Sequence, residues 1–441
     1  MGPRSRDDFR VAIVCALARE AAAVLDLFDE CYDEDGSRYG KEDGDMNVYT
    51  TGCIGPYDIV LIHMPSMGVH SAARAASQVR MSFKKISLAL VVGVCGGAPL
   101  TQPIILGDVV ISNSVIEFYT GRHYSDGIQA KSGPVHTLGR PNPEIRALLN
   151  KLDIPRVRKR LEANLRRSLT ELCKKSDTAQ YPGVEHDKLF AASYRHMHRK
   201  ETSQQQCLCL LSRSDNDPVC DEALNSSCEV LGCDVEATEN PSRRMRLTSG
   251  VPAPSVHIGT IGATAVMKSG QHRDIIANEN KIIAFEMEGA GVWEDLPCVI
   301  IKGVCDYADS HRNKKWQDYA AATAAAGAKA FLDHWGSKQH VGERSSEKRP
   351  LSLGDQDDAS TSRRVRRQPL SVTQGPTSDG TNSELPVIQA LASLGARKVL
   401  FEALNYQQLD ARHATIKTAH AATCQWLLSQ PKYLDLSLIH I

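Results

Sequence analysis

The sequence has no surplus of charge of either sign. Lys and Arg together number 52, and so do Asp and Glu, which gives a formal net charge of zero. General attraction to nucleic acid or to an acidic membrane surface needs a basic surplus, so we expect neither nucleic acid nor a membrane as a partner.

A long apolar run is also missing. No stretch approaches the roughly 20 apolar residues that span a bilayer, and residues 1–10 are polar, unlike the start of a signal peptide. We therefore expect a soluble, cytoplasmic protein. Its 13 cysteines are then expected to be reduced thiols rather than disulfides.

Short apolar, β-branched runs bounded by Gly, Pro or Asn predict buried strands. These runs span 10–17, 46–51, 57–64, 88–92, 108–113, 257–261, 282–287 and 298–306. Alanine-rich stretches with helical spacing lie at 20–30, 71–80 and 315–335. Alternating strands and helices predict an α/β fold with a mixed, mostly parallel central sheet flanked by helices.

The composition divides the chain into three parts. We expect one α/β domain over 8–335, interrupted by a charged, Cys-rich insertion at 123–254 that includes a basic helix at 157–175. Residues 336–384 are rich in Ser, Arg, Asp and Pro and cannot bury enough apolar surface to offset chain entropy, which predicts a disordered linker. An apolar stripe predicts a helical segment at 385–435.

Two acidic residues follow predicted strands. Asp306 closes the apolar strand 298–306, and open α/β sheets bind ligands at the carboxyl ends of their strands. Glu20 follows the first strand at the start of a helix. Each has a structural alternative: a turn or helix-capping aspartate for Asp306, and a carboxylate that complements the helix dipole for Glu20.

The run Phe285-Glu286-Met287-Glu288 places two acids one residue apart, followed by Gly289 and Gly291. In an extended chain the two carboxylates would share a face. The glycines predict a turn, so that only one acid need face a pocket. The structural alternative is an ion pair at the end of a strand.

Glycine-rich sequence follows the strand predicted at 88–92. Gly93, Gly96 and Gly97 allow backbone N–H groups to approach a ligand closely. No Gly-Lys-Ser/Thr follows, so this segment is not a P-loop.

The order and the amino-acid sequences of these motifs resemble those of the nucleoside phosphorylase/nucleosidase family, which includes purine nucleoside phosphorylases and methylthioadenosine/S-adenosylhomocysteine nucleosidases. The matching stretches are VAIVCALAREAA at 11–22, VVGVCGGAP at 91–99, LGDVVIS at 106–112, AFEMEGAGVW at 284–293 and IKGVCDYADSHRNKKWQDYAAATAAA at 301–326. These sequences most resemble the fungal version of the domain, which is found at the amino end of NOD-like receptors ahead of a NACHT module. The helical pattern at 410–428 resembles the lead-in to such a module.

The resemblance implies roles for the candidate residues. Asp306 would be the general acid at the purine N7, Glu288 would hold the ribose hydroxyls, and Met287 would lie against the sugar. A turn at Gly93–Gly97 would border the ribose and the nucleophile. Residues implied to bind substrate are Glu288, Met287, Phe285, Gly93, Val94, Gly96 and Gly97.

Glu20 matches the carboxylate that positions water in the nucleosidases. Phosphorylases of the family carry a Gly-Asp-Pro-x-Arg loop after the first strand, where this chain has Cys-Ala-Leu-Ala-Arg-Glu at 15–20. We therefore predict hydrolysis of an adenosine-type nucleoside or nucleotide. The alternatives are a phosphate-dependent phosphorylase and a catalytically silent signalling module of a NOD-like receptor. Oligomers are usual in the family, so a homo-oligomer is an open alternative.

Five cysteines crowd the predicted insertion just after His196 and His198. They are Cys207, Cys209, Cys220, Cys228 and Cys233. Thiolates and imidazoles are ligands that suit zinc, although the spacings match no standard zinc finger. No cofactor is otherwise expected, and the alternative to zinc is a set of reduced thiols in a loop.

Overall fold

The computed structural model describes residues 2–336, with gaps at 35–36, 101, 119–120, 125–126, 131–137, 140, 200–206, 211, 213–216, 234–240, 249 and 312–313. All of these residues fall in the first of two compact units, Met1–Glu347. The predicted linker, beyond Gly336, and the helical segment 385–435 lie outside the described residues. No described helix is long and apolar enough to cross a membrane.

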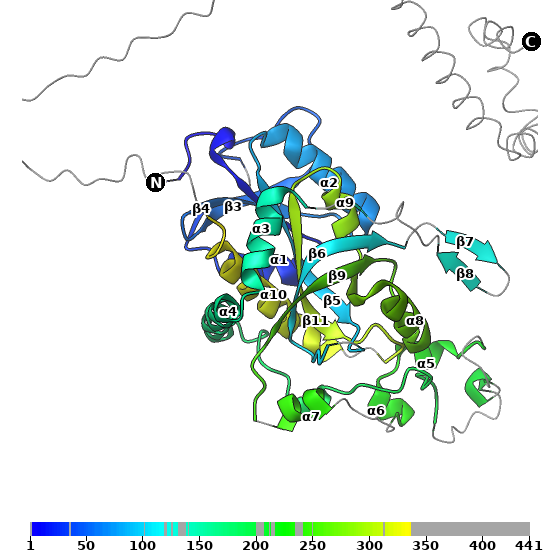
Figure 1. Ribbon diagram of the computed structural model, residues 1–441. Coiled ribbons are helices and arrows are strands. Elements are labelled where there is room, and N and C mark those ends of the chain that lie inside the picture. Colours follow the sequence, from blue (N-terminus) through cyan, green and yellow to red (C-terminus); the bar gives the residue numbers. More distant parts are fainter. Residues whose placement is uncertain are drawn as a thin grey trace, which may run out of the picture. The chain divides into compact units, whose positions relative to one another are not determined.

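A nine-stranded mixed sheet, in the order β10-β9-β6-β11-β5-β1-β4-β3-β2, organises the described residues (Figure 1). Its strands are β1 (Val11–Cys15), β2 (Glu30–Asp33), β3 (Val48–Ile54), β4 (Tyr57–His63), β5 (Leu88–Gly97), β6 (Val109–Glu117), β9 (Val256–Ala263), β10 (Ile282–Glu286) and β11 (Cys298–Asp306). β1 and β11 both run parallel to β5, so their carboxyl ends meet at one edge. β10 also pairs with β5 in antiparallel fashion, which closes β5, β11, β6, β9 and β10 into a ring of pairings.

Helices cover both faces of this sheet. α10 (Gln317–Leu332) packs so closely on β11 that a Cβ on Gly303 would collide with the Ala320 carbonyl. α9 (Gly289–Trp293) packs at Ile300, three residues earlier in β11 and therefore on the opposite face. α2 (Val69–Ser82) lies against α9, and α1 (Ala18–Leu25) lies against α10 (Figure 1). The prediction of an α/β fold with a mixed, mostly parallel sheet flanked by helices is confirmed.

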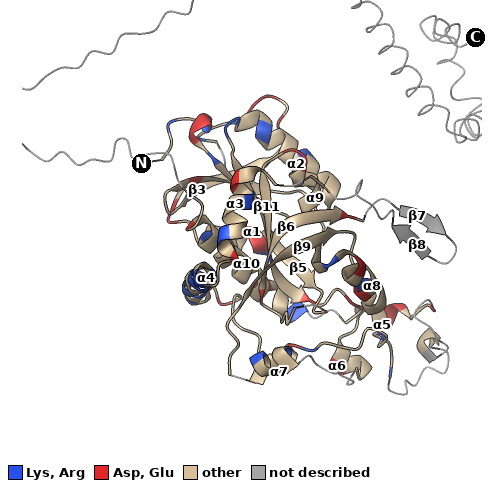
Figure 2. Cartoon of the chain, viewed as in Figure 1, with Lys and Arg blue, Asp and Glu red and all other residues tan. Residues whose placement is uncertain are grey.

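Part of the predicted insertion 123–254 packs on the sheet domain. α4 (Pro155–Lys175) lies against α10 and buries a stripe of leucines, among them Leu161, Leu165 and Leu172. Figure 2 shows Lys and Arg along the rest of this helix, which is a solvated basic face. The remaining described elements are α3 (Pro143–Leu152), α5 (Asp221–Asn225), α6 (Cys228–Leu231), α7 (Pro241–Thr248), α8 (Gly270–Asn280) and the hairpin strands β7 (Gly121–Tyr124) and β8 (Gly127–Ala130). The insertion boundaries stay a prediction.

Two local predictions need correction. The helix expected at 20–30 ends at Leu25, and residues Glu30–Asp33 form the edge strand β2. This strand has no apolar run; it forms because it pairs with β3, where Gly52 leaves room for the ring of Phe28. The strand predicted at 88–92 continues to Gly97, so Gly93–Gly97 is extended backbone rather than a turn.

Candidate active site

A cavity opens where the carboxyl ends of β1, β5 and β11 meet. Its volume is about 260 Å³, just below the roughly 300–1,000 Å³ that is usual for small-molecule sites. Seven of the nine residues predicted for the catalytic and substrate sites line it: Glu20, Val94, Gly96, Phe285, Met287, Glu288 and Asp306. The segments that carry them are far apart in the sequence, and the fold brings them together.

Glu20 sits in the first turn of α1 and reaches back to the strand ends. Its Oε2 accepts hydrogen bonds from the backbone N–H groups of Ala16 and Leu17 at 3.0 and 2.9 Å, and its Oε1 accepts one from Val94 at 2.8 Å. The carboxylate therefore caps the helix, as the structural alternative proposed, and also borders the cavity. Burial raises its pKa, against the opposing effect of the nearby Lys302 charge.

The two acids of the Glu-x-Glu run both line the cavity, although we expected that only one need do so. Glu286, at the end of β10, accepts hydrogen bonds from the backbone N–H groups of Glu288 and Gly289. Glu288 Oε2 accepts one from Lys302 Nζ at 2.8 Å, and its Oε1 accepts one from the Gly68 N–H at 3.3 Å. The ion pair foreseen as a structural alternative is thus present, at the wall of the cavity.

Lys302 is the main residue that sequence reasoning missed. It interrupts the apolar strand β11, its side chain is 1% exposed, and its Nζ also lies 3.7 Å from Glu286 Oε2. Burial opposes its charge, but the surrounding Glu288, Glu20 and Glu286 carboxylates outweigh burial and raise its pKa. A lysine in a buried strand almost always has a charged partner, so this was the signal available in the sequence.

Asp306, the last residue of β11, faces the cavity beside Gly96. Its Oδ1 accepts a hydrogen bond from the Ala308 N–H at 2.9 Å, the turn geometry of the structural alternative. A Cβ on Gly96 would lie 2.7 Å from the same oxygen, so glycine allows the carboxylate to approach β5. Asp306 is 8% exposed, which keeps it reachable from the cavity while shielding it from bulk water.

Contacts behind Asp306 hold the backbone that follows it. The Tyr307 hydroxyl donates to Asp187 Oδ1 at 2.6 Å and accepts from Arg243 Nη2 at 2.9 Å, and Arg243 also pairs with Asp187. On the other side, Arg273 Nη1 donates to the Tyr307 carbonyl at 2.8 Å. These buried groups fix the exit of β11 and with it the direction of the Asp306 side chain.

Gly93 and Gly97, the other two predicted residues, lie behind the cavity wall. A Cβ on Gly93 would collide with the Glu20 carboxylate, and a Cβ on Gly97 would lie 2.9 Å from a Val304 methyl. Both glycines therefore serve close packing of strand and side chain. The direct border of the cavity on β5 is formed by Val94, Cys95 and Gly96.

The rim of the cavity is mostly apolar. Met67, Met267 and the loop residues Thr264, Ala265 and Val266 contribute to it, together with Arg19. The Arg19 guanidinium pairs with Asp318 Oδ1 at 2.7 Å. Arg19 is the one Lys or Arg among the described residues that line the cavity.

The five predicted cysteines lie outside this cavity, in two groups. Cys228 and Cys233 gather with His196 and His311, and Cys207, Cys209 and Cys220 gather with His198. His311 was missed by sequence reasoning because it comes from the loop after β11, far along the chain from the cysteines.

Comparison with known proteins shows what the first part of the sheet domain is similar to. A model of the phosphorylase superfamily matches residues 10–174. Residues 10–174 are therefore similar to the phosphorylase superfamily. The strands β1 and β5 and the residues Glu20, Val94 and Gly96 fall within the matched range.

The chain is also similar to one longer protein and to several smaller proteins of known structure. A nucleotide-binding leucine-rich repeat (NLR)-like protein of Hyaloscypha variabilis is 28% identical over 336 residues, which are 74% of this chain and 29% of that protein. The chain thus covers less than a third of this relative's length. Solved structures include the 5'-methylthioadenosine/S-adenosyl homocysteine nucleosidase of Helicobacter pylori, at 13% identity, a TM-score of 0.43 and coverage of 74% of this chain and 98% of that one. The futalosine hydrolase of the same organism has 14% identity, a TM-score of 0.43 and coverage of 75% and 99%.

Proposed function

We propose that the sheet domain is a purine nucleoside N-glycosidase, which uses water to split the ribose–base bond of an adenosine-type nucleoside or nucleotide. The observation that carries the proposal is the convergence of Glu20, Glu288 and Asp306 on one cavity. Such a reaction needs a proton for the leaving base, a hold on the ribose and a nucleophile at the sugar. Three separately held carboxyl groups match these three needs.

Asp306 is proposed as the general acid. A purine leaves poorly as an anion, so a proton donor at N7 lowers the barrier. Asp306 is held at the end of β11 by the Ala308 N–H, and its carboxylate lies close against Gly96. The apolar side chains of Phe285 and Met267 line the same cavity.

Glu288 is proposed to accept the ribose hydroxyls. Its carboxylate is oriented by Lys302 and by the Gly68 N–H, and these fixed bonds reduce the reorganisation needed when the sugar gains positive charge. Met287, the neighbouring residue, lies against the same cavity and would contact the apolar face of the sugar.

Glu20 is proposed to position the attacking water and to take its proton. Burial raises its pKa, which makes this carboxylate a stronger base than an exposed glutamate. Three backbone N–H groups hold it, so its orientation is set before the substrate arrives.

Water is favoured over phosphate by the charge of the cavity. Four carboxyl side chains line it, from Glu20, Glu286, Glu288 and Asp306, whereas Arg19 is its one cationic lining residue and is already paired with Asp318. A phosphate dianion would meet like charges without a free cation to bind it. Neutral water carries no such penalty.

Chromatography of the products from a panel of purine nucleosides and nucleotides, with and without phosphate, tests the proposal. We expect free purine base in both conditions at equal rates. Release only in the presence of phosphate would replace hydrolysis by phosphorolysis. Ligand binding without release of base would assign the domain to a silent signalling module instead.

A further inference from the structure

Each of the two Cys/His groups contains four side chains that converge on one point. The first is His196, Cys228, Cys233 and His311, and the second is His198, Cys207, Cys209 and Cys220. Within each group the candidate ligand atoms all lie within 4.8 Å of one another. We propose that the chain binds two zinc ions, one in each group, and we call the groups site one and site two.

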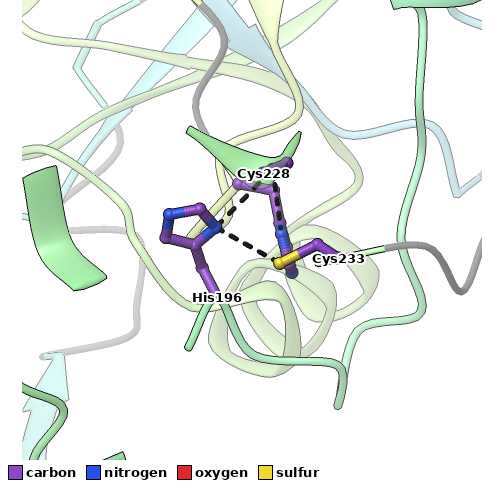
Figure 3. A group of neighbouring side chains, drawn as sticks. His196, Cys228 and Cys233 are labelled. Atoms are coloured by element: carbon purple, nitrogen blue, oxygen red, sulfur yellow. Dashed lines mark hydrogen bonds between the residues drawn. The ribbon is translucent and has the colours of Figure 1, made fainter. Parts of the chain in front are cut away.

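The distances in site one are those between the ligands of a tetrahedral zinc. His196 Nδ1 lies 3.5 Å from Cys228 Sγ and 3.6 Å from Cys233 Sγ (Figure 3). Cys228 Sγ also lies 3.6 Å from His311 Nδ1. Zinc with Zn–S of about 2.3 Å and Zn–N of about 2.05 Å in tetrahedral geometry separates a sulfur and a nitrogen ligand by roughly 3.6 Å. The sulfur–nitrogen distances in site one therefore agree with the separation expected for tetrahedral zinc.

Site two has three sulfur ligands and one nitrogen ligand, and its distances also agree with those of tetrahedral zinc. His198 Nδ1 lies 3.4 Å from Cys207 Sγ and 3.3 Å from Cys220 Sγ. Cys220 Sγ lies 3.7 Å from the sulfurs of both Cys207 and Cys209. Tetrahedral zinc separates two sulfur ligands by about 3.8 Å, whereas a disulfide needs about 2.05 Å, so this sulfur spacing matches metal ligation and not a disulfide.

The second nitrogen of each histidine supports the assignment. His196 Nε2 lies 2.9 Å from the Ser226 carbonyl and His311 Nε2 lies 2.7 Å from the Tyr194 carbonyl, so each must donate its N–H there. That tautomer leaves an unprotonated Nδ1 facing the site, as a zinc ligand requires. In site two, His198 Nε2 faces the Glu222 carboxylate at 3.8 Å.

The segment that carries these ligands has little core of its own. Its cluster of buried apolar residues consists of Phe190, Ala223 and Leu231 together with Cys207, Cys209 and Cys233. Half of that core is therefore thiol, and so few apolar side chains cannot offset the entropy of ordering the chain. Metal ligation supplies the missing stabilisation in small domains of this kind.

Site one also connects this segment to the candidate active site. His311 follows Asp306 in the loop after β11, and its ring stacks on Phe190 with centroids 3.9 Å apart. The backbone N–H of His196 donates to Ser310 Oγ, in the same loop, at 3.1 Å. A zinc ion at site one would fix the loop beyond Asp306 to the Cys-rich segment.

The test is the metal content of the purified full chain, measured by elemental analysis and native mass spectrometry. We expect two zinc ions per chain in the wild type. His311→Ala, which removes a site-one ligand from outside the Cys-rich segment, should leave one, and Cys207→Ser should leave one at site one. The control Cys31→Ser, which changes an exposed cysteine on β2, should keep two.

A wild-type chain without zinc, or with iron in its place, would overturn the assignment. Loss of both ions on His311→Ala together with retained native secondary structure would show that the two sites are not separate. Cobalt substitution of the wild type gives a measurement that needs no variant: we expect the visible absorption of tetrahedral cobalt with thiolate ligands, and an octahedral spectrum would contradict the geometry. None of these readouts depends on nucleoside cleavage, so their outcome is distinct from that of the proposed function.

Discussion

The cavity with its carboxylates and the Cys/His segment are held in place by different means. The carboxylates extend from strand ends of a sheet whose core is one large cluster of buried apolar residues, from Phe9 to Trp335. The Cys/His segment has six buried residues in its own cluster, three of them cysteines. In the sheet domain, packing of the apolar core holds the carboxylates in place. In the Cys/His segment, the core is small, so the Cys and His side chains must themselves hold the chain together by binding metal.

The two regions also differ in which polar groups they bury near their sites. Lys302 and Glu288 are buried as an ion pair because the surrounding strands are rigid enough to keep their 2.8 Å contact. In the Cys/His segment, the buried imidazoles of His196 and His198 instead converge with cysteine thiols in the two groups. If the two regions are as independent as this contrast implies, a change in one should leave the other intact.

The largest effect is expected from Asp306→Asn. An amide cannot deliver the proton, so we expect the rate of base release to fall by about 10²–10⁴-fold, measured by chromatography at saturating nucleoside. Asp45→Asn is the matched control, because Asp45 is also buried and hydrogen-bonded but contacts Tyr49 and Ser82 away from the cavity. A full rate in Asp306→Asn would remove this residue from the mechanism.

Lys302→Met should destabilise the sheet domain by about 3–5 kcal/mol, because it leaves buried carboxylates without their cation. Urea unfolding followed by circular dichroism measures the change. Lys84→Met is the control, since Lys84 forms an exposed ion pair worth about 1 kcal/mol or less. If the two variants were equally stable, Lys302 would be dispensable and the contrast between the regions would weaken.

The pH dependence of the reaction should follow Glu20. The side chain must be ionised to accept a proton, and burial raises its pKa. Activity should therefore be lost on acidification at a higher pH than an exposed glutamate would give, and be regained as the pH rises. Glu20→Gln should lower kcat/KM by about 10²-fold and abolish this acidic limb; an unchanged limb in the variant would assign it to another group.

The smallest effect on the sheet domain is expected from metal removal. A chelator should increase proteolysis within residues 190–233 several-fold, because ordering of that segment depends on its ligands. The melting temperature of the sheet domain should shift by only a few degrees. Global unfolding on chelation would show that the two regions form a single cooperative unit.

The sequence predicted the strands well where burial is continuous. β1 has no charged residue, and β11 has only Lys302 and its last residue, Asp306; the ends of these strands place Glu20 and Asp306 where parallel strands converge. β2 was missed because its residues Glu30–Asp33 have no apolar pattern and depend on pairing with β3. The extent of β5 was missed because glycines suggested a turn, whereas Gly93 and Gly96 make room for carboxylates that arrive from other segments.

The two sites also differ in which of their residues could be predicted from the sequence. Glu20, Glu288 and Asp306 each follow a recognisable strand, so local patterns located them. Lys302 and His311 act through partners that only tertiary contact supplies, Glu288 for the lysine and Cys228 for the histidine. Local patterns do not encode such pairings between distant segments. An isolated lysine in an apolar strand nevertheless indicates that a charged partner lies nearby in the fold.

The source of the oxygen that the sugar gains tests the central claim most directly. The domain is incubated with adenosine-type substrates in ¹⁸O-labelled water containing unlabelled phosphate, and the sugar product is analysed by mass spectrometry. We predict free ribose that carries one ¹⁸O at its anomeric carbon when it is trapped by reduction as it forms, because this oxygen otherwise exchanges with water, and about 10²–10⁴-fold less ribose from the Asp306→Asn variant. Ribose 1-phosphate without label, or no sugar product from the wild type, would contradict a hydrolytic site built from these carboxylates.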